Sequence, residues 1–153
     1  MEIKGHRTSV SDKTKRYFER MFYREKQIER AVNEIRNDNG GGHTGGSNAH
    51  ALVSDPTAVQ GIRAASEVKT VVLDDGIVVR KPERWLRIIK NTYIKTDGIT
   101  RMILEKRFRE SKKMDIIADE IGISQRRAYE IKDDVFGGFV LAAAVQEGIV
   151  KVY

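Results

Sequence analysis

The stretch Met114-Asp-Ile-Ile-Ala-Asp-Glu-Ile-Gly-Ile-Ser-Gln-Arg-Arg-Ala-Tyr-Glu-Ile-Lys-Asp-Asp134 decides the fold, because its small and apolar residues predict two short helices joined by a tight turn. Ile117 and Ile121 lie four residues apart, so they share one face of the first helix. Ala118 falls where the two helices approach most closely, which requires a small side chain. The first half of the stretch therefore predicts a helix that packs through this face.

The turn between the two helices has a signature of its own. Gly122 can adopt the left-handed conformation that commonly ends a helix, and Ile123 fills the angle between the helices. Ser124 is a preferred N-cap, because its hydroxyl accepts a hydrogen bond from a free N–H of the following turn. Ala128 and Ile131 return the second helix to the shared core, so the stretch predicts a helix-turn-helix.

The second helix of this motif is the predicted recognition helix, which would lie in the major groove of DNA. Arginine pairs bidentately with guanine and glutamine with adenine, and the free N–H groups at a helix N-terminus favour a phosphate. Lysines beside the motif are expected to hold the phosphate backbone without reading the base sequence. The predicted DNA-contacting residues are Ser124, Gln125, Arg126, Arg127, Tyr129, Lys132, Lys112 and Lys113.

Two other interpretations of this stretch stay open. One is a helical hairpin inside an all-α core, with Arg126 and Arg127 on a solvated face. The other is a helix-turn-helix that contacts protein instead of DNA. The helix expected over residues 99–110 adds four basic residues whose orientation toward DNA the sequence leaves undecided, namely Arg101, Lys106, Arg107 and Arg109.

An amphipathic segment lies near the N-terminus. No Gly or Pro occurs from Lys13 to Arg36, and Ser11-Asp12 offers N-caps, so we predict one long helix. Its apolar stripe either packs on the chain's own core or mediates self-association. For the second case we expect a homodimer through residues 13–36, because paired half-sites increase the affinity for DNA. The stripe consists of Phe18, Met21, Ile28, Val32 and Ile35.

The middle of the chain has a different composition. Residues 37–50 contain five glycines, which predicts a flexible linker. Asp55-Pro56 can begin a short helix that ends near Ala65. The β-branched runs at residues 70–73 and 77–79 flank Asp-Gly, so we predict a β-hairpin there.

A core helix that begins at Pro82 and carries Trp85 follows the hairpin. Gly137-Gly138 is expected to interrupt the apolar segment after the helix-turn-helix, and residues 148–153 are expected to form a strand that joins the hairpin. The predicted fold is mainly α, with a long N-terminal helix, a Gly-rich linker, and a helical C-terminal domain that includes a small β element. The predicted segments are the N-terminal helix over residues 1–37, the linker over 38–54 and the DNA-binding domain over 55–153.

The composition limits the class of partner. The 153 residues include 28 Lys+Arg against 22 Asp+Glu, with a net charge of +6, which favours a polyanion such as nucleic acid. No cysteine is present, which excludes disulfides, thiol catalysis and cysteine-ligated zinc. No apolar run approaches the roughly 20 residues of a membrane span, and the first residues lack the apolar core of a signal peptide. We therefore expect a cytoplasmic protein without membrane contact.

Catalysis is not expected. The carboxylates of Asp74-Asp75 and Asp133-Asp134 are adjacent in sequence and point apart on a strand or helix, whereas hydrolysis needs converging carboxylates. His6, His43 and His50 lie in polar or Gly-rich segments without an acidic cluster beside them. We accordingly expect no enzyme activity, no cofactor and no metal ion.

Three pieces of the chain, which together cover residues 38–140, carry a family resemblance. One is the Gly-rich stretch leading into Ser54-Asp-Pro-Thr57. Another is Asp75-Gly-Ile-Val-Val-Arg-Lys-Pro-Glu-Arg-Trp85, followed by Ile88, Ile89 and Tyr93. The last is the helix-turn-helix with Leu104, Phe108, Lys112-Lys113, Ile117-Ala118 and Ile123-Ser124 around it. This last piece is similar to region 4 of bacterial sigma factors. The whole resembles the late-operon transcriptional activators of phages of Gram-positive bacteria, the RinA and ArpU group.

The resemblance implies sequence-specific binding upstream of a late phage promoter, recruitment of host RNA polymerase, and a location in the bacterial host cytoplasm. Asp133-Asp134 departs from the basic end that recognition helices often have, which puts the extent of the DNA-contacting helix in doubt. The alternative is a small-terminase-like subunit for DNA packaging, which also joins a helix-turn-helix to an oligomerising helix. The two differ in assembly size, because such subunits form rings.

Overall fold

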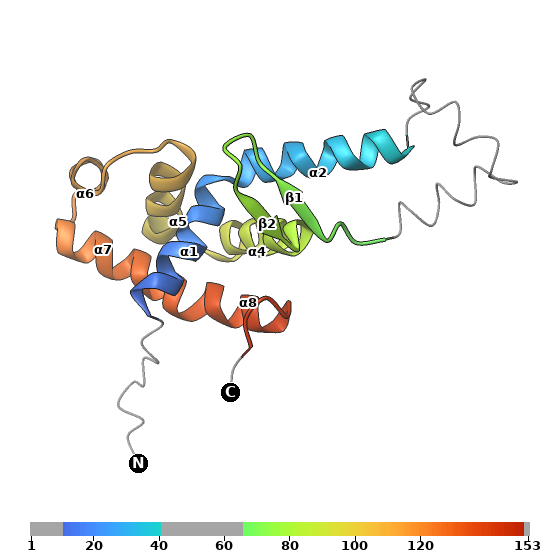
Figure 1. The fold of residues 1–153 in the computed structure, drawn as a ribbon. Helices are drawn as coiled ribbons and strands as arrows, with labels where there is room; N and C mark the ends of the chain where they lie inside the picture. Colours follow the sequence, from blue (N-terminus) through green and yellow to red (C-terminus); the bar gives the residue numbers. More distant parts are fainter. Residues whose placement is uncertain (1–10, 41–65, 152–153) are drawn as a thin grey trace, which may run out of the picture. The chain divides into compact units, whose positions relative to one another are not determined.

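The computed structural model describes residues 11–40 and 66–151 (Figure 1). These residues belong to two compact units. The described part of unit 1 consists of residues 11–25 and 84–151, and that of unit 2 of residues 26–40 and 66–83. The described chain is mainly helical with one small antiparallel sheet, so the predicted fold class is confirmed. The unit boundaries differ from those of the predicted segments, because the first helix belongs to unit 1.

The N-terminal segment forms two helices where the sequence predicted one. Helix α1 (Asp12–Tyr23) begins after Ser11, whose Oγ accepts a hydrogen bond of 3.2 Å from the N–H of Thr14. Arg24 leaves helical geometry, with φ −99° and ψ 12°, and helix α2 (Glu25–Gly40) follows. The prediction of an unbroken helix was wrong at this residue, because neither Gly nor Pro marks the break.

The residue that follows the break binds a side chain from another part of unit 1. Glu25 is buried, and its carboxylate accepts hydrogen bonds of 3.3 Å from both Nε and Nη2 of Arg109. Helix α2 also takes in residues 38–40 of the predicted linker. The rest of that linker and the helix predicted over residues 55–65 lie outside the described residues.

Aromatic side chains of α1 form the centre of unit 1. The ring of Phe22 lies 5.6 Å from that of Phe108 and 4.9 Å from that of Phe136, and the ring of Phe18 lies 5.5 Å from that of Trp85. The structure therefore supports the interpretation that the stripe packs on the chain's own core. The stripe residues Phe18, Met21, Ile28 and Val32 are all buried, so they offer no free apolar face for the predicted homodimer.

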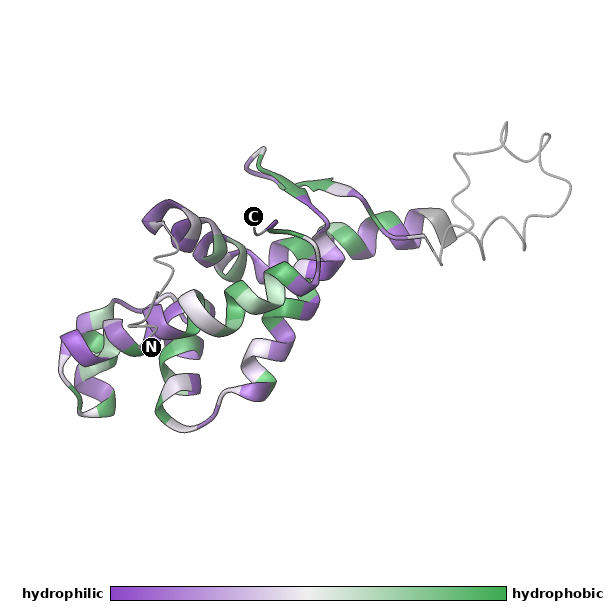
Figure 2. Ribbon diagram, turned by 90° about the horizontal axis from the view of Figure 1, so that it is seen from below, coloured by the Kyte–Doolittle hydropathy of each residue, from purple (hydrophilic) through white to green (hydrophobic). Residues whose placement is uncertain are grey.

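Unit 1 contains α4 from Arg84 onward and the helices α5 to α8, with two π-helical turns among them. Helix α4 spans Pro82–Lys95, α5 spans Gly98–Leu104, and the π-helical turn η3 spans Glu105–Arg109. Helix α6 spans Met114–Ile121, and α7 (Gln125–Asp134), the turn η4 (Val135–Val140) and α8 (Leu141–Gln146) follow as one helical run. Apolar and hydrophilic segments alternate along these helices (Figure 2). Within the described residues, no helix combines the length and the apolar character of a membrane span.

The glycine pair in η4 does not interrupt this helical run, which corrects the expectation from the sequence. Gly137 and Gly138 lie inside the π-helical turn, and Phe136, Val140 and Ala144 form a buried stripe along it. Packing of this stripe in the core outweighs the weak helix propensity of the two glycines. The prediction of an interruption at this point was therefore wrong.

The C-terminal segment caps α8 and forms no strand through Lys151, so the predicted third strand is not present in the described residues. Gly148 has φ +70°, and the N–H groups of Ile149 and Val150 donate to the carbonyl oxygen of Ala144 at 2.9 and 3.2 Å. A left-handed glycine with such backward hydrogen bonds satisfies carbonyl groups that a helix end leaves free. This capping turns the chain back instead of extending it.

Unit 2 contains the predicted β-hairpin. Strands β1 (Thr70–Val72) and β2 (Val78–Arg80) pair antiparallel, with Val71 opposite Val79. Both of these valines are buried, while their neighbours along each strand are exposed. The turn between the strands includes Gly76 at φ +82°, as the Asp-Gly signal predicts.

The continuous helix through η4 makes a prediction about stability. Gly138→Ala should stabilise the protein by up to about 1 kcal/mol, because alanine is the better helix former and its Cβ would meet nothing within 4 Å. Gly76→Ala is the matched control, since its Cβ also meets open space but its φ is positive. The control should instead destabilise by about 1 kcal/mol. Urea unfolding of both variants measures these differences, and destabilisation by Gly138→Ala would contradict the continuous helix.

Candidate nucleic-acid interface

The predicted helix-turn-helix is present between α6 and α7. Gly122 ends α6 with φ +81° and ψ 35°, and its N–H donates to the carbonyl oxygen of Ala118 at 2.9 Å. The Oγ of Ser124 accepts a hydrogen bond of 3.1 Å from the N–H of Arg127, which caps α7. The turn residues therefore have the conformations that the sequence predicts.

A small core joins these two helices to α5. Its buried residues are Ile103 of α5, Met114, Ile117 and Ala118 of α6, and Ala128 of α7. The partly buried Ile121, Ile123 and Ile131 pack against this core. The inner positions predicted for the motif are thus confirmed, and α5 is a third helix that supports it. Because this core fixes the inner face of α7, the opposite face is presented to solvent.

The N-terminal half of that outer face carries most of the predicted base-reading residues. Gln125, Arg126, Arg127 and Tyr129 are all exposed, and the side chain of Arg126 keeps 89% of its accessible surface. Ser124 is exposed as well, but its hydroxyl oxygen already accepts the capping hydrogen bond. The structure therefore brings five of the predicted residues together around the first turns of α7.

Both arginines of this face bind the same carboxylate. Glu130 accepts Arg126 Nε at 3.2 Å and lies 3.5 Å from Arg127 Nη1. Ion pairs one helical turn apart on an exposed face contribute only about 0.3–0.5 kcal/mol. These two arginines are accordingly held near Glu130 but can exchange it for a stronger anionic partner at small cost.

The two lysines predicted before α6 differ in their environment. The Nζ of Lys112 donates to both carboxylate oxygens of Glu120, at 2.9 and 3.1 Å. Glu120 also accepts Lys106 Nζ at 2.7 Å, and these hydrogen bonds from Lys106 and Lys112 lower the pKa of the Glu120 carboxyl. Lys113 is exposed, and its side chain forms no hydrogen bond or ion pair with the described residues, so of the two it is the freer phosphate contact.

Lys132 does not lie on the outer face, which corrects its predicted role as a phosphate contact. Its side chain is only 8% exposed, and its ammonium group forms a hydrogen-bonded ion pair with Glu19 of α1. Asp133 lies 3.7 Å from the same ammonium. A buried lysine is stable only when it is paired, so Lys132 holds α1 and α7 together.

The basic residues of α5 and η3, whose orientation the sequence left undecided, also have partners. Arg101 pairs with Glu105 at 3.3 Å, and Arg109 binds Glu25. Lys106 binds Glu120, while Arg107 donates to the carbonyl oxygen of Lys112 at 3.0 Å. These contacts orient the residues within unit 1 and leave fewer cations for an outside anion.

The charge around the motif is balanced. Residues 112–134 contain five basic and six acidic residues, so the motif as a whole has no basic excess. Apart from the buried Lys132, its basic residues precede α6 or lie in the first turns of α7, whereas Asp133-Asp134 lies at the far end of α7. An anion would therefore approach the N-terminal end of α7, where free backbone N–H groups add positive potential.

Metal-ligating side chains do not gather in the part of the chain that the structure describes. There, no three His, Asp or Glu residues lie close enough to hold an ion. His6, His43 and His50, which the sequence gave no role, lie outside the described residues.

Comparison of the chain with protein-family models, with curated proteins and with solved structures gave no match.

The buried ion pair between α1 and α7 generates a prediction. Glu19→Gln should destabilise the protein by about 2–4 kcal/mol, because it leaves a buried ammonium without its main counter-ion. The double change Glu19→Leu with Lys132→Met should recover most of this loss, since apolar pairs of similar volume replace buried ion pairs well. Urea unfolding of Glu19→Leu, of Lys132→Met and of the double variant measures the coupling. Additive effects of the single changes would show that the pair contributes nothing.

Proposed function

We propose that this protein binds double-stranded DNA through α6 and α7 and acts as a transcription activator without catalytic activity. The observation that carries the proposal is the outer face of α7, where Gln125, Arg126, Arg127 and Tyr129 are exposed beside a capped helix N-terminus. These residue types at the start of a second helix match the way in which a recognition helix reads base edges.

The support from α5 strengthens this proposal. A recognition helix must be held rigidly, because base readout requires hydrogen-bond geometry accurate to a fraction of an ångström. The shared core of Ile103, Ile117 and Ala128 fixes α7 against two other helices. A helical hairpin without function would need the same core but would not need a cluster of exposed arginine, glutamine and tyrosine at one end.

Contact with DNA would replace the Glu130 interaction. A phosphate or the edge of a guanine offers Arg126 a charge-assisted or bidentate bond, and a bidentate base pair discriminates by about 1–3 kcal/mol. That gain exceeds the roughly 0.3–0.5 kcal/mol of an exposed pair along a helix. The arginines are therefore available to DNA, and Glu130 weakens binding to anions that cannot compete with it.

The transcriptional part of the proposal comes from the resemblance to the phage late-operon activators. On that basis the protein would bind upstream of a late promoter in the bacterial host cytoplasm and contact host RNA polymerase. Crosslinking the tagged protein in cells and sequencing the recovered DNA tests this directly. A sharp site upstream of a long operon is the expected result. Enrichment at a packaging start, or a ring-sized assembly in solution, would overturn the activator and favour a packaging subunit.

Two substitutions separate base reading from phosphate contact. Arg126→Ala should weaken binding to the recovered site by about 1–3 kcal/mol and relax its specificity. Lys113→Ala should weaken binding to all DNA sequences alike and reduce the salt dependence by about one counter-ion. Fluorescence anisotropy on the recovered site and on an unrelated duplex, across a salt series, measures both. Unchanged affinity of Arg126→Ala for the recovered site would rule out its contact in the groove.

Removing the carboxylate of Glu130, which competes with DNA for the two arginines, should increase the affinity for DNA. Glu130→Gln should tighten DNA binding by roughly 0.5–1 kcal/mol, because it frees both arginines and removes a negative charge near the phosphates. Glu34→Gln, which removes an equal charge from an exposed position on α2, is the matched control and should leave the affinity nearly unchanged. Equal tightening by both variants would indicate only a net-charge effect.

A further inference from the structure

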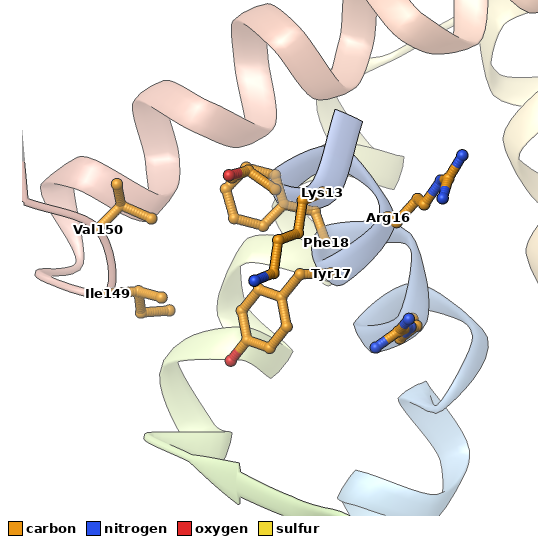
Figure 3. A pocket seen from close by; sticks show the side chains of 8 residues that line it. Lys13, Arg16, Tyr17, Phe18, Ile149 and Val150 are labelled. Carbon is orange, nitrogen blue, oxygen red and sulfur yellow. The ribbon is translucent and has the colours of Figure 1, made fainter. Parts of the chain in front are cut away.

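A hollow in unit 1 lies beside α1, away from the residues proposed to read DNA. It has a volume of about 610 Å³ and is lined by α1 and by the segment that caps α8, a size typical of ligand-binding clefts. Figure 3 shows Ile149 and Val150 opposite Tyr17 and Lys13, with Arg16 farther away and pointing outward from α1. We call this site the α1 hollow, and its lining residues are Lys13, Thr14, Arg16, Tyr17, Phe18, Arg20, Ile149 and Val150.

The floor of the α1 hollow is apolar and firmly held. Phe18 is fully buried, and the ring of Tyr17 packs edge-on against Trp85 at 5.8 Å. Ile149 and Val150 are partly exposed, and their N–H groups are fixed on the carbonyl oxygen of Ala144. A hollow with such walls favours an occupant that brings an aromatic or aliphatic group.

The rim of the α1 hollow is cationic and unpaired. Lys13, Arg16 and Arg20 form no side-chain hydrogen bond or ion pair with other described residues, and no lining residue is acidic. This differs from the motif region, where Lys112, Arg126 and other cations have carboxylate partners. The charge complementary to this rim is therefore negative and must come from outside the described residues.

We propose that the α1 hollow binds an acidic peptide segment of a partner protein that carries an aromatic or aliphatic side chain. The apolar side chain enters between Tyr17 and Ile149, and the carboxylates lie on the cationic rim. DNA satisfies only half of these requirements, because its phosphate backbone offers charge but no apolar group for the floor. A free inorganic anion likewise leaves the floor unused. This inference goes beyond DNA binding and does not depend on it.

Trp85 provides a direct readout, because it is the single tryptophan of the chain and touches Tyr17 in the wall of the hollow. The probe is a short fluorescein-labelled peptide rich in glutamate with a central phenylalanine and leucine, added to the full chain. Binding is followed by anisotropy, and an unlabelled copy of the peptide is used to follow Trp85 emission. We expect saturable binding that shifts this emission and weakens as salt is added.

Matched variants locate the binding. Arg16→Glu with Arg20→Glu should weaken peptide binding by about tenfold or more, the equivalent of one lost charge-assisted hydrogen bond. Ile149→Ser should weaken it through the floor while leaving the charge unchanged. Lys26→Glu with Arg30→Glu makes the same charge change at exposed positions of α2 and should have little effect. Thermal unfolding of each variant confirms that the fold is retained.

Several results would overturn the proposal. Equal loss in the α2 control, or equal binding of a peptide with every glutamate replaced by glutamine, would show that no specific ionic recognition occurs. Absence of binding by the wild-type chain would have the same meaning. If Arg16→Glu with Arg20→Glu abolished DNA binding but left peptide binding intact, the rim would belong to the DNA interface. The effect of Arg126→Ala on DNA binding is measured separately, so failure here leaves the DNA proposal standing.

Discussion

The mutual contact of three phenylalanine rings holds unit 1 together. Phe22 of α1, Phe108 of η3 and Phe136 of η4 lie with their ring centroids 4.9–5.6 Å apart, in tilted or edge-on arrangements. Such pairs contribute about 0.5–1.5 kcal/mol each beyond the burial of their area. Two of the three rings, Phe108 and Phe136, come from the π-helical turns η3 and η4. The helix-turn-helix and the α1 hollow both rest on this packing.

Around this apolar centre, two ion pairs, each with one buried partner, fix α1 and the first residue of α2. Glu19 binds Lys132 of α7, and Glu25 binds Arg109 of η3. Buried pairs add little net stability but are costly to break, so they select one arrangement of the helices over others of similar burial. The same lysine could not also serve an external phosphate. Lys132 is therefore a structural cation, in contrast to the exposed Arg126 and Arg127 of the same helix.

The helix-turn-helix could be predicted because its signals are short-range. A left-handed glycine, an N-cap serine and small residues at the closest approach each depend on a few neighbouring residues, and all of them were confirmed. The outward residues of α7 followed from the same periodicity. The hairpin around Gly76 was predicted for the same reason, since Asp-Gly selects the turn locally.

The features that the sequence did not reveal depend on contacts between distant residues. The break at Arg24 accompanies the pairing of Glu25 with Arg109, and the burial of Lys132 depends on Glu19; no local pattern records either pair. The helix persists through Gly137 and Gly138 because Phe136 and Val140 are buried on both sides of them. Proximity in space, rather than residue propensity, decided these positions, so composition and periodicity alone could not predict them.

The uninterrupted run from Gln125 to Gln146 sets a fixed spacing between two surfaces of the protein. One end presents the arginines that we propose contact DNA, and the other leads through a capped turn into Ile149 and Val150. At about 1.5 Å of rise and 100° of rotation per residue, inserting or deleting a single residue would shift and twist one surface against the other. The number of residues in this helical run should therefore tolerate as little change as the side chains at its two ends.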